Sequence, residues 1–180
     1  MDLPSIGTLA SLPAAEYPEL MAAPVAEALA GWQHAALVAV VEIDPALADT
    51  TAMMGAYSLP MTAGANCVIV AGRREGEERI AACVVRADTR VDVNNLVKRI
   101  LNVRKPSFLK TERAVEESAM EYGGITPLGL PAAWRVLVDS TASDIDVAII
   151  GSGLRRSKLL LPGTLLAELP RAEVIDGLGR

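Results

Sequence analysis

The sequence predicts an α+β fold: a compact single domain in which helices flank a mixed β-sheet. Its 180 residues are 51% apolar, which is enough for one domain with a real core. Segments with strand character alternate irregularly with segments of helical spacing, so a doubly wound parallel sheet is not expected. We therefore predict one domain at residues 24–180, preceded by an N-terminal extension at residues 1–23 that is rich in Pro and Ala.

The first half of the domain predicts a helix, a strand and a second helix. Pro24 occupies the first turn of the first helix. The apolar run at residues 35–43 predicts a buried strand. Asp44 then supplies an N-cap and Pro45 a first-turn proline for a helix that we expect to continue to Tyr57.

The middle of the chain predicts a β-hairpin followed by two helices. The hairpin strands are expected at residues 66–71 and 79–86, joined by a long polar loop. Asp92 can cap a helix that reaches Leu101. Pro106 then breaks the chain, and another helix is expected from Thr111 to the pair Gly123-Gly124.

The C-terminal third is predicted to be rich in strands. A tight turn separates the second and third of these strands, and a short helix precedes the last. The predicted strands are residues 134–138, 145–150, 158–161 and 172–175, with the turn at 151–153 and the short helix at 162–169.

The charge distribution limits the partners. Residues 1–72 contain seven acids and no Lys or Arg, whereas residues 73–180 contain 17 bases and 15 acids. Such a chain lacks the broad basic face that duplex DNA requires, so we expect no DNA partner. The longest apolar run has seven residues against the roughly 20 of a membrane span, which predicts no membrane partner and a cytoplasmic location.

No sequence motif indicates a metal or a cofactor. Cys67 and Cys83 are 16 residues apart, which is not a zinc or redox spacing, and His34 is the single histidine. Phosphate-binding and dinucleotide-binding glycine motifs are also missing. We therefore expect buried, reduced thiols, no metal and no cofactor; Cys67 is expected to face away from its neighbour Asn66 because side chains alternate along a strand.

Two glycine-rich segments are the candidate site. Residues 123–129 follow a helix, so they can be a helix stop and turn, or a loop whose bare N–H groups hold a carbonyl oxygen or oxyanion. Residues 151–153 can likewise be a hairpin turn or part of a site. Basic side chains at residues 98–113 and 155–158 suit either a solvated face or contacts with phosphates.

The order of these motifs resembles the YbaK/EbsC family, which includes the editing domain associated with prolyl-tRNA synthetase. The segment EESAMEYGGITPLG at residues 116–129 looks like the family's helix and Gly-x-x-x-Pro loop. VLVD at 136–139, IIGSG at 149–153 and LLP at 160–162 follow in the family's order, and the resemblance covers residues 24–178.

This resemblance implies a barrel-like mixed sheet, hydrolysis of mischarged aminoacyl-tRNA carrying a small amino acid, and contact with the tRNA acceptor end. It implies that the Gly-x-x-x-Pro loop binds the aminoacyl carbonyl through backbone amides. The implied catalytic residues are Gly124 and Asn66, which stands where the family has a functional Lys. The implied substrate-binding residues are Gly123, Ile125, Thr126, Pro127, Gly151, Ser152 and Gly153.

Three functions remain open at this point. The first is a trans-acting aminoacyl-tRNA deacylase. The second, suggested by Asn66, is a non-catalytic relative that binds an aminoacyl-ended or nucleotide-like ligand. The third is an interaction module whose acidic N-terminal part docks a basic partner. Self-association as a homo-oligomer is left open.

Overall fold

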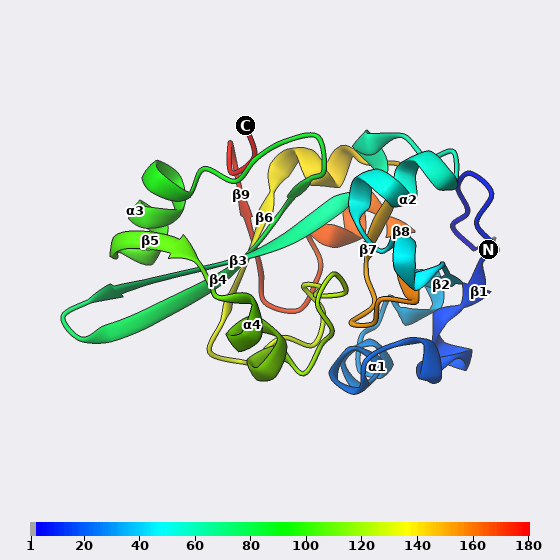
Figure 1. The fold of residues 1–180 in the computed structure, drawn as a ribbon, viewed down its shortest axis with the longest axis horizontal. Helices are drawn as coiled ribbons and strands as arrows, with labels where there is room; N and C mark the ends of the chain where they lie inside the picture. The colour runs from blue at the N-terminus through cyan, green and yellow to red at the C-terminus, as the bar shows by residue number, and fades with distance from the viewer. Residues whose placement is uncertain (1–2) are drawn as a thin grey trace.

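The computed structural model describes residues 3–180, and in this part of the chain two β-sheets are surrounded by short helices (Figure 1). One sheet is antiparallel, with the order β1-β2-β8-β7: Leu12–Pro13, Ala39–Glu42, Ser157–Pro162 and Val147–Gly151. The other is mixed, with the order β5-β3-β4-β6-β9: Arg104–Phe108, Ala65–Arg74, Glu77–Arg86, Arg135–Asp139 and Ala172–Ile175. The predicted α+β class and the mixed sheet are confirmed.

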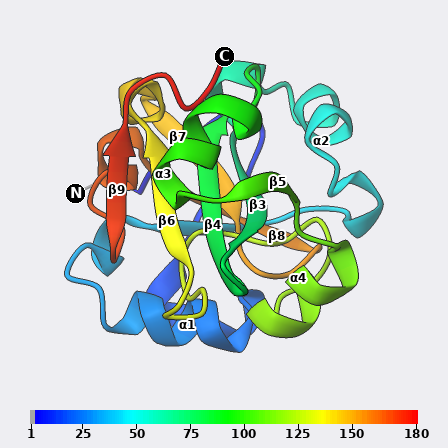
Figure 2. The ribbon, with the colours of Figure 1, turned by 90° about the vertical axis from the view of Figure 1, so that its left-hand side faces the viewer.

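The mixed sheet combines both strand directions. β3 pairs antiparallel with β4 and β5, whereas β4–β6 and β6–β9 are parallel. Figure 2 shows β9, β6, β4 and β3 side by side, with α3 and β5 on the near side. A single parallel bridge between Gly64 and Ile149 links the two sheets. This junction matters for function because the candidate site lies beside it.

The β3–β4 hairpin is longer and tighter than predicted. Its turn is only Glu75 and Gly76, both at positive φ (55° and 83°), as a two-residue type I′ turn requires. The polar residues expected in a loop instead extend both strands. Arg73 lies opposite Glu78 in the register, and this pair of opposite charges suits a cross-strand position.

The predicted helix from Asp44 to Tyr57 is two helices. Asp44 caps the 3₁₀ helix η4 (Pro45–Leu47) by accepting from Ala46 N, and Asp49 starts α2 (Thr50–Ala56) by accepting from the N–H groups of Thr51 and Ala52. The second cap holds Asp49 in an extended conformation, which interrupts the helix. This break places Asp49 and Thr50 at the rim of the site.

Other helix and strand boundaries differ from the predicted ones for identifiable reasons. The buried strand begins only at Ala39, after a 3₁₀ turn. Pro106 does not end the ordered structure but lies in β5, an edge strand, where its missing N–H is tolerated. α4 (Thr111–Ser118) ends at Ala119, which has a positive φ of 53°, and not at Gly123.

The remaining helices follow the prediction more closely. α1 is Ala23–Ala30, with its proline in the first turn. Asp92 caps the π-helical turn η6 (Val93–Val97), which continues into α3 (Lys98–Leu101). The short C-terminal helix is the 3₁₀ helix η8 (Gly163–Leu166), and the last strand lies at the predicted residues. No helix in the described residues is both long enough and apolar enough to cross a bilayer.

The N-terminal residues pack onto the same core as the rest of the chain. β1 pairs with β2, and the side chains of Ala14 and Leu20 are buried. Ala22 N donates to Ser152 O, which ties this segment to the turn between β7 and β8. A domain boundary at residue 24 stays a prediction.

Candidate functional site

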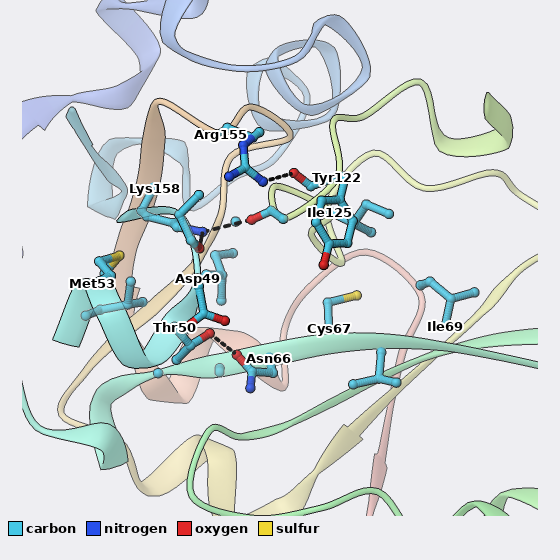
Figure 3. A pocket seen from close by; sticks show the side chains of 18 of the residues that line it. Asp49, Thr50, Met53, Asn66, Cys67, Ile69, Tyr122, Ile125, Arg155 and Lys158 are labelled. Carbon is cyan, nitrogen blue, oxygen red and sulfur yellow. Dashed lines mark hydrogen bonds between the residues drawn. The ribbon is translucent and has the colours of Figure 1, made fainter. Parts of the chain in front are cut away.

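A pocket of about 470 Å³ opens between the two sheets (Figure 3). This volume falls within the range of roughly 300–1,000 Å³ that is typical of small-molecule sites. Its lining comes from five segments: the start of α2 with the residues before it, the first half of β3, residues 108–114 from the end of β5 into α4, the loop at residues 122–125, and the β7–β8 hairpin. We call the side formed by α2 and β3 the β3 wall, and the side formed by the loop and the hairpin the loop wall.

The pocket runs along an open edge of β3. β5 pairs with β3 at Val70, Ala71 and Arg73, and Leu109 N donates to Ile69 O, so residues 65–68 lack a backbone partner on that side. Side chains from both faces of a strand can border a pocket at its edge, and both Asn66 and Cys67 line it. The prediction that Cys67 lies on the strand face opposite Asn66 is not contradicted, and Cys67 nevertheless lines the pocket (Figure 3).

Asn66 is held by the start of α2. Thr50 Oγ1 donates to Asn66 Oδ1 at 3.1 Å. The Nδ2 group of Asn66 has no hydrogen-bond acceptor within residues 3–180.

The first glycine loop contributes two residues to the pocket, Gly123 and Ile125. Neither of their backbone N–H groups has an acceptor in the described part of the chain. Gly124 does not line the pocket. Its carbonyl accepts from Gly153 N at 2.8 Å, and a Cβ at Gly124 would lie 2.8 Å from the backbone of Gly153 and Leu154.

The second glycine loop packs against the first. Gly151 lines the pocket, and a Cβ there would lie 2.2 Å from Gly124 O. Ser152 is buried and bonds Ser157, and Gly153 has a φ of +84°. Glycine is thus needed where the two loops touch each other, which is a different reason from access for a ligand.

The nine predicted site residues therefore divide into two groups. Four line the pocket: Asn66, Gly123, Ile125 and Gly151. Five lie in the wall behind it: Gly124, Thr126, Pro127, Ser152 and Gly153. The catalytic and substrate-binding roles of all nine stay predictions.

Lys158 is the pocket residue whose importance the sequence analysis missed. It comes from β8, is only 8% exposed, and donates from Nζ to Gly123 O at 3.0 Å and to Ala48 O at 3.4 Å. Burial, helped by the nearby charge of Arg155, lowers the pKa of Lys158 to about 8, while Asp49 opposes the shift. The sequence signal that could have identified it is a single lysine in a strand whose following residues, Leu159 to Leu161, are all apolar.

Arg155 connects two segments at the mouth of the pocket through hydrogen bonds. Its guanidinium donates to Tyr122 O and to Pro45 O, each at 3.0 Å, and lies 5.7 Å from the centroid of the Tyr122 ring. The loop wall is thereby connected to the segment that leads into α2.

The pocket contains polar donors but no activated protein nucleophile among the described residues. Burial, together with Cys83, raises the pKa of the Cys67 thiol far above its usual value, so Cys67 stays a thiol near neutral pH. His34 lies outside the pocket and bonds Glu168 at 2.8 Å. The described residues include no group of three or more His, Cys, Asp or Glu that could hold a metal. The arrangement suits chemistry carried out by positioning and by electrostatic stabilisation.

Solved structures share this fold. A candidate trans-editing enzyme for prolyl tRNA synthetase has a TM-score of 0.70 at 18% identity, covering 92% of this chain and 96% of that one. A scaffold protein used for computational epitope grafting has a TM-score of 0.71 at 18% identity, with 86% and 95% covered. Hypothetical protein APE2540 has a TM-score of 0.68 at 18% identity, with 78% and 90% covered. At this identity the likeness shows the fold alone.

The sequence itself identifies the family. No curated protein matches the chain. The family model described as the aminoacyl-tRNA editing domain matches residues 44–169, well over half of the chain and all five segments of the pocket. The chain therefore belongs to the aminoacyl-tRNA editing domain family, as its resemblance to YbaK predicted.

Proposed function

We propose that the protein is a trans-acting aminoacyl-tRNA deacylase that hydrolyses the ester of tRNA mischarged with a small amino acid. The observation that carries this proposal is that Gly123 and Ile125, whose N–H groups have no acceptor within residues 3–180, line one pocket together with the buried Lys158. Such donors suit the carbonyl oxygen of an ester, on which negative charge develops during hydrolysis.

The inner part of the pocket suits a small aliphatic side chain. Its lining includes Met53, Met54, Ile149 and Ile150, with alanine and glycine between them. Methionine side chains adapt to irregular apolar groups, and the small residues leave room for only a modest ligand. The identity of the amino acid is left to experiment.

The mouth of the pocket suits the acceptor end of tRNA. Phe108 and Tyr122 line it and are 63% and 65% exposed, and such rings can stack on a nucleobase. Phe108 ends β5, whose Arg104 and Lys105 are exposed. These basic side chains can meet phosphates next to a stacked base.

In the proposed reaction, water attacks the carbonyl carbon of the ester. A bond forms from the water oxygen to this carbon, and the ester C–O bond breaks. One proton of the water passes to the departing ribose oxygen, and the other is released to solvent. The amino acid leaves as its carboxylate, and the tRNA regains its terminal hydroxyl. No covalent enzyme intermediate is required, in agreement with the pocket's lack of an activated nucleophile.

The alternative is a non-catalytic relative that binds an aminoacyl-ended or nucleotide-like ligand. It is favoured by Asn66, an uncharged residue at the position where the resemblance implies a lysine. The same pocket would then bind the ligand without hydrolysing it.

A deacylation screen distinguishes the two functions. The full chain is incubated with a panel of aminoacyl-tRNAs, each prepared with cognate and non-cognate amino acids, and the release of amino acid is followed over time. We expect hydrolysis above the spontaneous rate for tRNA carrying one or a few small amino acids. Hydrolysis of none of them, together with saturable binding of an aminoacyl-tRNA, would favour the binding module.

A further inference from the structure

Lys158 is a buried cation that lines the pocket, and the Asp49 carboxylate in the same pocket is too far away to form a salt bridge with it. Its side chain is 8% exposed, and within residues 3–180 it forms no salt bridge. Both of its acceptors are neutral carbonyl oxygens. Burial of an unpaired ammonium is costly, so a lysine with only a structural role would be a poor choice at this position.

The hydrogen bonds of Lys158 leave one donor free. An ammonium group has three N–H bonds. Two of them have acceptors in Gly123 O and Ala48 O. The third has no acceptor among the described residues, and Lys158 lines the pocket from the loop wall (Figure 3).

The charged and titratable neighbours of Lys158 come from each element around the pocket. Asp49 caps α2, and its Oδ1 already accepts from Thr51 N and Ala52 N. Arg155, in the β7–β8 turn, is occupied by two carbonyl oxygens, and Cys67 on β3 stays a neutral thiol. Tyr122, the fourth neighbour, lies at the exposed mouth. Arg155 also retains free N–H bonds, because a guanidinium has five, but it lies at the mouth of the pocket. Lys158 is the buried cation of the pocket, and one of its N–H bonds has no acceptor among the described residues.

We propose that Lys158 is a catalytic residue of this pocket: its free N–H bonds the carbonyl oxygen of the aminoacyl ester and stabilises the negative charge that forms when water adds. The inference rests on the proposed deacylase function. Lys158 keeps all its protons throughout, so it changes no bond and serves as an electrostatic group beside the amides of Gly123 and Ile125. Its bond to Gly123 O holds the same loop in place.

The kinetic test compares three variants in steady-state deacylation of the best substrate from the panel. Lys158→Met keeps the length of the side chain and removes the charge, Lys158→Arg keeps the charge, and Arg90→Met removes an exposed cation outside the pocket. We expect Lys158→Met to lower kcat on the order of 100-fold with KM changed less than about 3-fold. Arg90→Met should stay within about 2-fold of wild type, and Lys158→Arg should retain part of the rate.

The pH dependence separates a catalytic charge from a structural one. Since the ammonium must be protonated, the ratio of the wild-type rate to the Lys158→Met rate should fall as the pH rises through about 8. A ratio that stays constant with pH, or a variant with wild-type kcat, would overturn the proposal. Circular dichroism of each variant shows whether the fold is intact.

A spectroscopic test does not depend on turnover. The chain has four lysines, and the other three, Lys98, Lys105 and Lys110, are exposed. Nuclear magnetic resonance of lysine-labelled protein can therefore follow Lys158 as the group that titrates near 8. An adenosine analogue with an amide-linked aminoacyl group should raise this pKa, because its carbonyl oxygen accepts a hydrogen bond from the charged form.

The outcomes distinguish the two proposals. If the wild type hydrolyses no aminoacyl-tRNA but the analogue raises the pKa of Lys158, the deacylase function fails, the catalytic role of Lys158 fails with it, and contact between Lys158 and the ligand stands. If hydrolysis is present and the saturating analogue leaves the pKa of Lys158 unchanged, the role of Lys158 fails and the deacylase function stands. Without hydrolysis and without a response to the analogue, both fail.

Discussion

The two walls of the pocket differ in the origin of their polar groups. The β3 wall comes from the part of the chain that lacks Lys and Arg. Its polar lining groups are the Asp49 carboxylate, the Thr50 hydroxyl, the Asn66 amide and the neutral Cys67 thiol. The loop wall contains Arg155 and Lys158 together with the free amides of residues 123 and 125. An electrostatic role therefore falls to the loop wall, which is assembled by contacts between distant segments.

The largest expected effect concerns the charge in the loop wall. Between pH 8 and 10.5 the unfolded state binds the Lys158 proton while the folded state releases it, so the wild type gains stability as the pH rises. Lys158→Met lacks this gain. The difference in unfolding free energy, wild type minus variant, should rise by up to about 3 kcal/mol across this window. Urea denaturation at several pH values measures it, and parallel pH curves would contradict the shifted pKa.

The next effect tests the packing between the two loops. Gly124→Ala places a Cβ against the backbone of Gly153 and Leu154, and should cost about 1–3 kcal/mol of unfolding free energy while lowering deacylation. Gly55→Ala is the matched control, since a Cβ there meets nothing within 4 Å in an exposed part of α2. It should be stabilising by about 0.5–1 kcal/mol. A stable, inactive Gly124→Ala would instead restore the predicted direct role of Gly124 at the ligand.

A lysine introduced on the β3 wall should reduce the difference in positive charge between the two walls. We expect Asn66→Lys to raise deacylation of at least one substrate on the order of 10-fold, and to recover part of the rate when combined with Lys158→Met. Asn66→Met controls for side-chain length without charge. If Asn66→Lys raises the rate in neither background, a positive charge on the β3 wall is not useful to the reaction.

The aromatic mouth gives a smaller expected effect. Phe108→Ala should raise KM about 5-fold and leave kcat unchanged, since loss of stacking on one base costs about 1 kcal/mol. Val174→Ala, at another exposed apolar side chain but on β9, is the control and should have no effect. Equal KM values for Phe108→Ala and wild type would exclude stacking by Phe108.

The smallest effect is expected at the thiol of the β3 wall. Cys67→Ala should change the deacylation rate less than about 2-fold, because burial keeps Cys67 protonated. A loss of more than 10-fold would make Cys67 part of the chemistry, and the β3 wall would then supply a reactive group.

The elements that were predicted correctly are determined by residues within or next to the element itself. Asp92 caps its helix as predicted. The strands β6 to β9 were predicted from apolar runs with turn residues between them. The errors arise where two local rules compete. Asp44 and Asp49 both cap a helix, and the positive φ of Glu75 makes a two-residue turn where the composition indicates a loop.

The sequence by itself determined the fold class, the family and three of the segments that border the pocket, because hydrophobic periodicity, capping residues and motif order are all local properties. Tertiary structure alone decided which residues of those segments face the pocket. Gly124 is turned into the contact with residues 153–154, while Lys158 passes from an apolar strand beneath the loop to Gly123 O. The physical reason is that burial and hydrogen-bond partners depend on residues 35 or more positions apart, which no local pattern specifies.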